Sequence, residues 1–247
     1  MFKEERYNQI LELLEKETYM SVEMLSKRLF VSLPTVRRDL AELQRRKLIL
    51  RSHGGAKKLN DESSVTPLDF RKTVHYKEKR LLCQAAARFI QDNDILFLDA
   101  STTVLQMADF IVPQSAVTVV TNSILLSTLL SKKGIKVFCT GGEAQQNSMC
   151  YAGSFAESFV RSFNFDKVFF SSHGISPAHM IVDTSLQETL LRRAVLEQSK
   201  QSFFLCDTSK FFLSAAYNLA AISDIDYMIT DDEGAASITC KKQVVTI

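Results

Sequence analysis

Small hydroxyl residues follow an apolar, strand-like run near the middle of the chain. The run ILFLD ends in Asp99 and leads into Ser101, Thr102 and Thr103. Hydroxyl groups and unpaired backbone N–H groups at the start of a helix can bind a phosphate, because that end of a helix carries partial positive charge. For this loop taken alone, the simpler alternative is that Ser101 or Thr102 only caps the following helix.

Further polar residues follow later strand-like runs. Ligands of parallel α/β sheets bind at the edge where the strands end, so these residues are expected to gather there. Together they favour a phosphate site over simple capping. The predicted effector-binding residues are Asp99, Ser101, Thr102, Thr103, Thr121, Asn122, Gly141, Gly142, Asp207 and Lys210.

The pattern around these residues predicts an α/β domain with a mostly parallel sheet. Short continuous apolar runs alternate with helical patterns, which is typical of strands buried on both faces. The strand-like runs are residues 94–99, 116–121, 135–139, 167–172, 202–207, 226–230 and 243–247. The helical patterns between them are residues 102–111, 123–132, 154–163 and 185–199.

The first 58 residues differ from the rest in charge and pattern. They hold thirteen Lys and Arg against eight Asp and Glu, a net charge of +5, whereas the remainder has seventeen against twenty, a net of −3. A basic head on a slightly acidic body suggests that the head meets a polyanion. We therefore expect residues 1–58 to form one domain, residues 59–75 a polar linker, and residues 76–247 the α/β domain.

The head contains three helical patterns followed by a hairpin. In the third pattern, Val36, Leu40 and Leu43 share a buried face, which leaves arginines on the free face near the helix start, as in helices that read the DNA major groove. The alternative is a three-helix bundle with merely solvated arginines. The segment KLILRSHGGAKK predicts a wing that contacts DNA phosphates. The predicted DNA-binding residues are Ser32, Thr35, Arg37, Arg38, Arg45, Arg51, His53, Gly54 and Gly55.

The segments VSLPTVRRDLAEL and RSHGGA resemble the signature of the DeoR family of bacterial transcriptional repressors. The resemblance extends through the body, from about Arg6 to Asp231. Two positions depart from the family pattern: Phe30 stands in a turn that often carries Gly or Asn, and Ser101 replaces a glycine. The matching residues are Arg37, Arg38, Asp39, His53, Gly54, Gly55, Ala56, Asp99, Thr102, Thr103, Thr121, Asn122, Gly141, Gly142, Gly153, Asp207, Ser209, Lys210 and Phe211.

This resemblance implies a winged helix-turn-helix head and a body similar to ribose-5-phosphate isomerase that senses a phosphorylated sugar or related metabolite. The expected function is a repressor, acting as a homodimer or larger homo-oligomer, that binds double-stranded operator DNA and is released by a phosphorylated effector. The effector, the operator and the sign of the response are left open by the sequence.

Two other functions are weighed against this one. A sugar-phosphate isomerase with a DNA-binding appendage needs a carboxylate base, but residues 167–182 contain none, and no catalytic residue is assigned. An architectural DNA binder would leave the polar groups of the body unexplained. Five scattered cysteines and four histidines predict neither metal nor cofactor. The absence of a secretory signal and of a long apolar run predicts a cytoplasmic protein.

Overall fold

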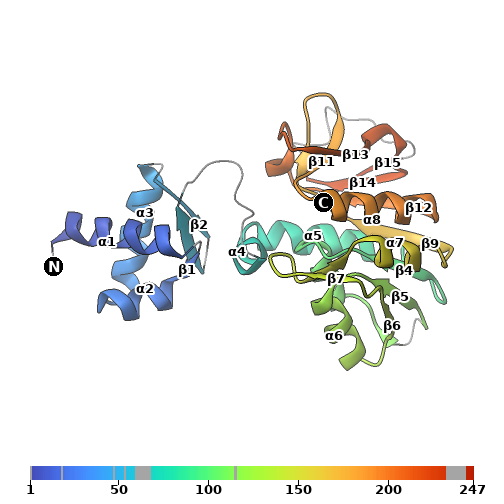
Figure 1. Ribbon diagram of the computed structural model, residues 1–247, viewed down its shortest axis with the longest axis horizontal. Coiled ribbons are helices and arrows are strands. Elements are labelled where there is room, and N and C mark those ends of the chain that lie inside the picture. Colours follow the sequence, from blue (N-terminus) through green and yellow to red (C-terminus); the bar gives the residue numbers. More distant parts are fainter. Residues whose placement is uncertain are drawn as a thin grey trace. The chain divides into compact units, whose positions relative to one another are not determined.

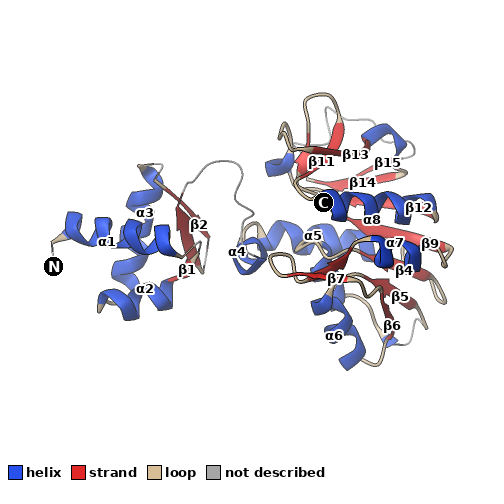
Figure 2. Cartoon of the chain, in the orientation of Figure 1, coloured by secondary structure: helices blue, strands red, loops and turns tan. Residues whose placement is uncertain are grey.

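The chain folds into two compact units, Met1–His75 and Tyr76–Ile247. The computed structural model describes residues 2–17, 19–46, 48–52, 54–58, 68–113, 116–231 and 243–247. Figure 1 follows the chain through both units, and Figure 2 separates their helices from their strands.

The first unit packs helices against a small antiparallel sheet with strand order β1-β3-β2. Val36, Leu40 and Leu43 are fully buried, which confirms the predicted inner face of α3. Strands β2 and β3 form the hairpin expected for a wing, with Arg51 opposite Ala56. The elements are α1 (Lys3–Lys16), β1 (Met20–Ser21), α2 (Val22–Leu29), α3 (Leu33–Arg45), β2 (Ile49–Ser52), β3 (Gly55–Lys58) and α4 (Leu68–Thr73).

The turn between α2 and α3 adopts a conformation that its sequence disfavours. Phe30 has φ 54° and ψ 41°, in the left-handed region that glycine or asparagine usually occupies. The backbone N–H groups of Phe30 and Val31 both donate to Ser26 O, and Ser26 Oγ donates to Val31 O at 2.5 Å. These bonds hold the turn even though the Phe30 side chain is 95% exposed.

The predicted linker is only partly irregular. Helix α4 (Leu68–Thr73) lies inside the segment 59–75 that was expected to be a polar linker. Residues 59–67 of the predicted linker lie outside the described residues. The sequence pattern missed α4 because a six-residue helix is too short to show a clear apolar period.

The second unit is built on a parallel sheet of seven described strands, in the order β15-β14-β12-β9-β4-β5-β6. Each of the seven strand-like runs forms one of these strands, so the predicted α/β class with a parallel sheet is confirmed. The strands are β4 (Ile95–Leu98), β5 (Thr118–Thr121), β6 (Lys136–Cys139), β9 (Phe165–Phe170), β12 (Ser199–Leu205), β14 (Tyr227–Thr230) and β15 (Gln243–Thr246).

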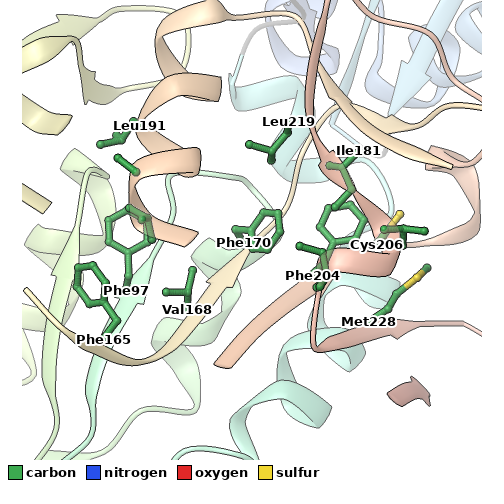
Figure 3. Close-up of a cluster of buried hydrophobic side chains, with 14 of the residues drawn as sticks. Phe97, Phe165, Val168, Phe170, Ile181, Leu191, Phe204, Cys206, Leu219 and Met228 are labelled. Carbon is green, nitrogen blue, oxygen red and sulfur yellow. The ribbon is translucent and has the colours of Figure 1, made fainter. Parts of the chain in front are cut away.

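Helices cover both faces of this sheet. Leu96 and Leu98 of β4 pack in one core cluster with residues of α5, η1 and α6, whereas Phe97 points into the opposite cluster with α7 and α8. Figure 3 shows the second cluster, where Leu191 of α8 lies near aromatic side chains of the sheet. The covering elements are α5 (Tyr76–Ala87), η1 (Val104–Asp109), α6 (Ile124–Lys132), α7 (Ser154–Val160) and α8 (Leu186–Glu197).

Smaller elements lie outside the main sheet, and the apolar pattern did not predict them. One small sheet has the order β10-β11-β13, and β7 pairs with β8 as an antiparallel hairpin. The helical pattern at 102–111 forms the 3₁₀ helix η1, shorter than expected and not an α-helix. The remaining elements are β7 (Glu143–Gln145), β8 (Cys150–Ala152), β10 (Gly174–Ile175), β11 (Met180–Asp183), η3 (Thr208–Lys210), β13 (Tyr217–Ala221) and η4 (Ile222–Asp224).

The strand order places a switch point at β4. From β4 the chain runs outward through β5 and β6, and it then returns to add β9 on the other side of β4. At such a point the connections that leave neighbouring strands diverge, and they open a space at the carboxyl edge of the sheet where ligands bind. The segment after β4, Asp99 to Thr103, lies at this point.

Candidate functional sites

Helix α3 presents two free arginines. Arg37 and Arg38 are exposed, and neither guanidinium has an ion-pair partner in the described part of the chain. Ser32 caps the helix by accepting a hydrogen bond from Thr35 N at 3.4 Å, and the two hydroxyls lie 2.9 Å apart. The start of α3 therefore offers unpaired positive charge on a rigid, capped helix.

Arg45 at the other end of α3 is already paired. Its Nε and Nη2 donate to Glu42 at 2.9 and 2.7 Å. Hydrogen bonds from Arg45 and Arg46 lower the pKa of Glu42 to about 2, so this carboxylate stays ionised beside them. A DNA phosphate would have to compete with Glu42 for Arg45, which makes Arg45 a weaker candidate than Arg38.

Asp39 fixes the position of α3 relative to α1 within the head. It is 2% exposed and accepts hydrogen bonds from both Nε and Nη2 of Arg6, the latter at 2.9 Å. This hydrogen bond with Asp39 also raises the pKa of Arg6. The pair ties α1 to α3, so the aspartate of the arginine-aspartate motif orients the helix while the arginines face outward.

The two wing glycines have different surroundings. A side chain at Gly55 would bring Cβ within 2.3 Å of Met20 O, because β1 pairs with β3 at this position. Gly55 is buried, which gives it a packing role in the hairpin. Gly54 and Arg51 are partly exposed and remain candidates. His53 lies outside the described residues.

Asp99 and Ser101, just after β4, form hydrogen bonds within the loop. Asp99 Oδ1 accepts from Ser101 N at 3.0 Å, and Ser101 Oγ accepts from Val104 N at 3.1 Å. Ser101 thus binds the backbone N–H of Val104, the first residue of η1, which supports the simpler of the two sequence interpretations for this residue. Because η1 is a single short 3₁₀ helix, its N-terminus adds little to anion binding, and the hydroxyls of Thr102 and Thr103 are the remaining donors of the loop.

Sequence reasoning missed Lys79, which reaches this loop from α5. Its side chain is buried, and Nζ donates to Thr102 Oγ1 at 3.2 Å. Cys83, one turn further along α5, donates from Sγ to Thr103 O at 3.0 Å. The signal that could have identified it is its spacing: Lys79 lies three, four and seven residues before Leu82, Cys83 and Ala86, on the same side of a helix.

Arg192 of α8 is the second residue that sequence reasoning missed. Nε donates to Asp99 Oδ2 at 3.0 Å, Nη1 to Asp183 Oδ2 at 2.9 Å, and Nη2 to Glu188 Oε2 at 3.1 Å. Burial alone lowers the pKa of Arg192, and the charges of Asp183, Asp99 and Glu188 outweigh it and raise the pKa. The guanidinium is therefore a permanently charged anchor for the end of β4.

Lys210 lies beside the switch point, as predicted from the residues after β12. Its Nζ donates to Ser171 Oγ at 2.8 Å and to Ser172 O at 2.7 Å, just after β9. Ser171 N in turn donates to Asp99 Oδ2 at 3.3 Å. Lys210, Ser171 and Asp99 are therefore joined at one edge of the sheet.

Thr121 and Asn122 follow β5 at the same edge. Thr121 Oγ1 donates to Leu98 O at 2.6 Å and accepts from Ser123 N at 3.0 Å, so this hydroxyl is used within the fold. Asn122 Nδ2 donates to Tyr151 O at 3.2 Å. Of the two, only Asn122 retains an unused polar atom, Oδ1.

Gly141 and Gly142 follow β6, the last strand on one side. Both have positive φ, and a Cβ at Gly142 would lie 2.7 Å from Ala152 O of the β7–β8 hairpin. β6 is four strands from β12 in the sheet order, and the Lys210 ammonium lies nearer, at the end of β9. The hairpin that follows them contacts α8, because Gln145 Nε2 donates to Gln187 Oε1 at 2.8 Å.

Buried polar atoms without a partner gather at the carboxyl edge. Of four such side-chain atoms in the described residues, three belong to Thr103, Asn122 and Asp207, which follow β4, β5 and β12. Asp207 uses its other oxygen, Oδ1, to accept from Ser209 N at 3.1 Å. Buried polar atoms are almost always hydrogen-bonded, so unpaired ones in a cluster point to a missing partner.

The opposite edge of the sheet holds a shallow pocket of about 440 Å³. Two of its charged groups are engaged: Lys200 Nζ donates to Asp166 Oδ1 at 2.7 Å, and Asp226 Oδ2 accepts from Ser202 N at 2.9 Å. The pocket is therefore a poorer ligand site than the carboxyl edge, despite its volume. In the described part of the chain, no cluster of His, Cys, Asp and Glu has the geometry of a metal site.

A winged helix-turn-helix followed by an α/β body with a polar sheet edge is the architecture of a two-domain transcriptional regulator. Residues 6–62 match the model of the DeoR-like helix-turn-helix domain, and residues 74–232 match the DeoR C terminal sensor domain. The chain belongs to the DeoR family, and it is a DNA-binding transcriptional regulator.

Two relatives of known name, both repressors, support this assignment. The chain is 32% identical to the glycerol-3-phosphate regulon repressor of Escherichia coli strain K12, covering 96% of this chain and 94% of the relative. It is 33% identical to the transcriptional repressor GlcR of Bacillus subtilis strain 168, covering 94% and 89%. A ribose 5-phosphate isomerase A from Methanocaldococcus jannaschii covers 56% of this chain and 55% of its own, at 11% identity and a TM-score of 0.42.

Among the described residues, every helix is too short or too polar to cross a bilayer.

Proposed function

We propose that this protein is a repressor whose binding to operator DNA is relieved by a phosphorylated sugar or polyol. The head would bind DNA through Arg37, Arg38 and the wing, and the body would hold the effector at the carboxyl edge of its sheet. The names of relatives support repression, and one of them refers to glycerol 3-phosphate.

The observation that carries the proposal is the cluster of polar groups around the switch point. Lys79 and Lys210 supply positive charge, Thr102 and Thr103 supply hydroxyls, and Asn122 supplies an unpaired acceptor. Lysines and hydroxyls suit a phosphate, whereas unpaired oxygen acceptors suit hydroxyl groups of a sugar. The acceptors include Asp207 Oδ2 as well, on the Lys210 side.

The strand spacing limits the part of this edge that one effector can occupy. β4 and β12 are two strands apart, about 10 Å, which a sugar phosphate can span. We therefore keep Ser101, Thr102, Thr103, Asn122, Asp207 and Lys210 as effector-binding candidates. Asp99 and Thr121 would support the site from within the fold.

An enzymatic role is the alternative, and the state of Asp99 disfavours it. A general base needs a free carboxylate oxygen near the substrate proton. Oδ1 of Asp99 accepts from Ser101 N, and Oδ2 accepts from Arg192 Nε and Ser171 N, so neither oxygen is free. Turnover of a sugar phosphate by the purified protein would contradict the regulator-only proposal.

Assembly and location complete the proposal. A homodimer or larger homo-oligomer would place two recognition helices on repeated half-sites, because the spacing of half-sites follows the symmetry of the protein. We propose a cytoplasmic location, where the DNA and metabolites are.

The experiment is a thermal-shift screen of the full chain with glycerol 3-phosphate, ribose 5-phosphate, glucose 6-phosphate and fructose 1-phosphate. A ligand that binds only the folded state raises the melting temperature. The corresponding unphosphorylated compounds are the matched controls. We expect at least one phosphorylated compound, and none of its controls, to raise the melting temperature. An equal shift with the unphosphorylated compound would contradict a phosphate site.

A further inference from the structure

One face of helix α5 contacts the candidate effector loop, which is the segment from Asp99 to Thr103 after β4. Lys79 Nζ donates to Thr102 Oγ1 at 3.2 Å, and Cys83 Sγ donates to Thr103 O at 3.0 Å. Residues four apart lie on the same side of a helix, so both contacts come from a single face. Lys79 and Cys83 are both buried, 5% and 0% exposed, which keeps water from competing for these bonds.

The same helix also holds the short helix that follows the loop. Arg80 of α5 forms an ion pair with Asp109 at the end of η1. Leu82 of α5 and Met107 of η1 belong to the same buried cluster. The loop and η1 are therefore linked to α5 at the Thr102 hydroxyl, at the Thr103 carbonyl and at the end of η1.

Helix α5 is also the first element of the body. It begins at Tyr76, directly after His75, the last residue of the first compact unit. The covalent chain thus runs from the first compact unit, which contains the head, directly into the helix that contacts the candidate effector loop. Lys79 is only one helical turn from that boundary.

We propose that α5, through the contact between Lys79 and Thr102, transmits the state of the effector loop to the DNA-binding head. The identity of the signal, a phosphorylated effector, rests on the proposed function. Thr102 Oγ1 accepts from Lys79 and has one proton of its own to donate, which an anion can accept. An anion there also attracts the Lys79 ammonium, so binding alters the contact that fixes α5.

The decisive experiment needs no effector. The full chain carries Lys79→Met, Thr102→Val or both, and the affinity is measured for a DNA duplex that the wild-type protein selects from a randomised library. Each single variant is expected to change this affinity at least threefold, and the double variant is expected to match a single variant. Lys77→Met, at an exposed position of the same helix, is expected to behave as wild type. Thr102→Ser, which keeps the hydroxyl, is expected to change the affinity less than Thr102→Val does.

Two results would overturn the proposal. One is unchanged duplex affinity in both single variants that remain folded by circular dichroism. The other is a double variant whose effect is the product of two independent effects, since a shared contact requires non-additivity. If Lys79→Met does not fold, the proposal is tested by comparing the duplex affinities of Thr102→Val and Thr102→Ser. These two variants differ in the hydroxyl group, and both keep Lys79.

A separate measurement tests the proposed function. The four sugar phosphates are added to wild-type protein bound to the duplex, and release of the duplex is recorded. If none acts, the proposed effector class is wrong, while the variants above still decide the role of α5. If one acts, Lys79→Met is expected to reduce its effect on duplex affinity at least tenfold, and an unreduced effect would overturn the role of α5.

Discussion

Arg192 Nε lies 3.0 Å from Asp99 Oδ2, so a buried guanidinium fastens helix α8 to the end of the central strand β4. Asp183 and Glu188 accept from the same guanidinium. One positive charge therefore serves three carboxylates beneath the candidate effector site.

Replacing Arg192 by Met should strongly destabilise the body. Breaking a buried charge pair from one side typically costs about 3–5 kcal/mol, because the carboxylates stay buried without their partner. The free energy of unfolding of the full chain, measured in urea by circular dichroism, checks this value. Arg161→Met removes an exposed pair with Glu197 and should cost about 1 kcal/mol or less. Equal losses in the two variants would show that Arg192 is not an anchor.

Arg38→Ala should weaken DNA binding about tenfold or more and leave effector binding intact. An arginine that contacts a base edge contributes about 1–3 kcal/mol. Fluorescence anisotropy with a selected duplex measures the loss. Arg45→Ala is the matched control, because Glu42 already pairs with Arg45, and its loss should be smaller. A larger loss for Arg45 than for Arg38 would reverse the assignment of the reading end of α3.

Lys210→Ala should abolish the response to the effector and spare duplex affinity. The ammonium lies between the ends of β9 and β12, where a phosphate would otherwise meet the carboxylates of Asp99 and Asp207. Thermal shift with an active sugar phosphate gives the readout. Lys200→Ala, near the opposite end of the same strand β12, should keep the full rise in melting temperature. A lost response in both variants, or in neither, would contradict the placement of the site.

Phe30→Gly should stabilise the head by up to about 1 kcal/mol. A left-handed backbone costs an L-residue about 1–2 kcal/mol, and the greater freedom of glycine in the unfolded chain offsets part of that gain. Urea unfolding of the full chain provides the test. Phe2→Gly changes an equally exposed phenylalanine with φ −69° and should bring no gain. A less stable Phe30→Gly variant would mean that the side chain stabilises the turn.

The sequence was sufficient for the main sheet and for α3. Runs such as ILFL are buried on both faces, so they are apolar throughout and read clearly as strands. Val36, Leu40 and Leu43 share the buried face of a capped helix. Their spacing of four and three residues predicts this face from the sequence. The elements missed, such as β7, β10 and α4, are two to six residues long and leave no period to detect.

The site could be predicted only in part, because it depends on strand order and on partners distant in the chain. Lys210 was found from its place after a strand, and the structure joins it to Ser171. The sequence does not reveal that β6, the strand before Gly142, is an outer strand of the described sheet. Arg192 and Lys79 lie on helices, and their contacts with Asp99 and Thr102 cross 93 and 23 residues of chain.

The central claim is that one protein binds DNA and a phosphorylated metabolite at separate, coupled sites. The most direct test measures both affinities in the full chain, each with and without the other ligand, by calorimetry and anisotropy. Thermodynamic linkage requires the effector to weaken duplex binding by the same factor as the duplex weakens effector binding. We expect a common factor of about 10 or more, within the usual range of such coupling. A sugar phosphate that binds tightly with duplex affinity unchanged would contradict the account.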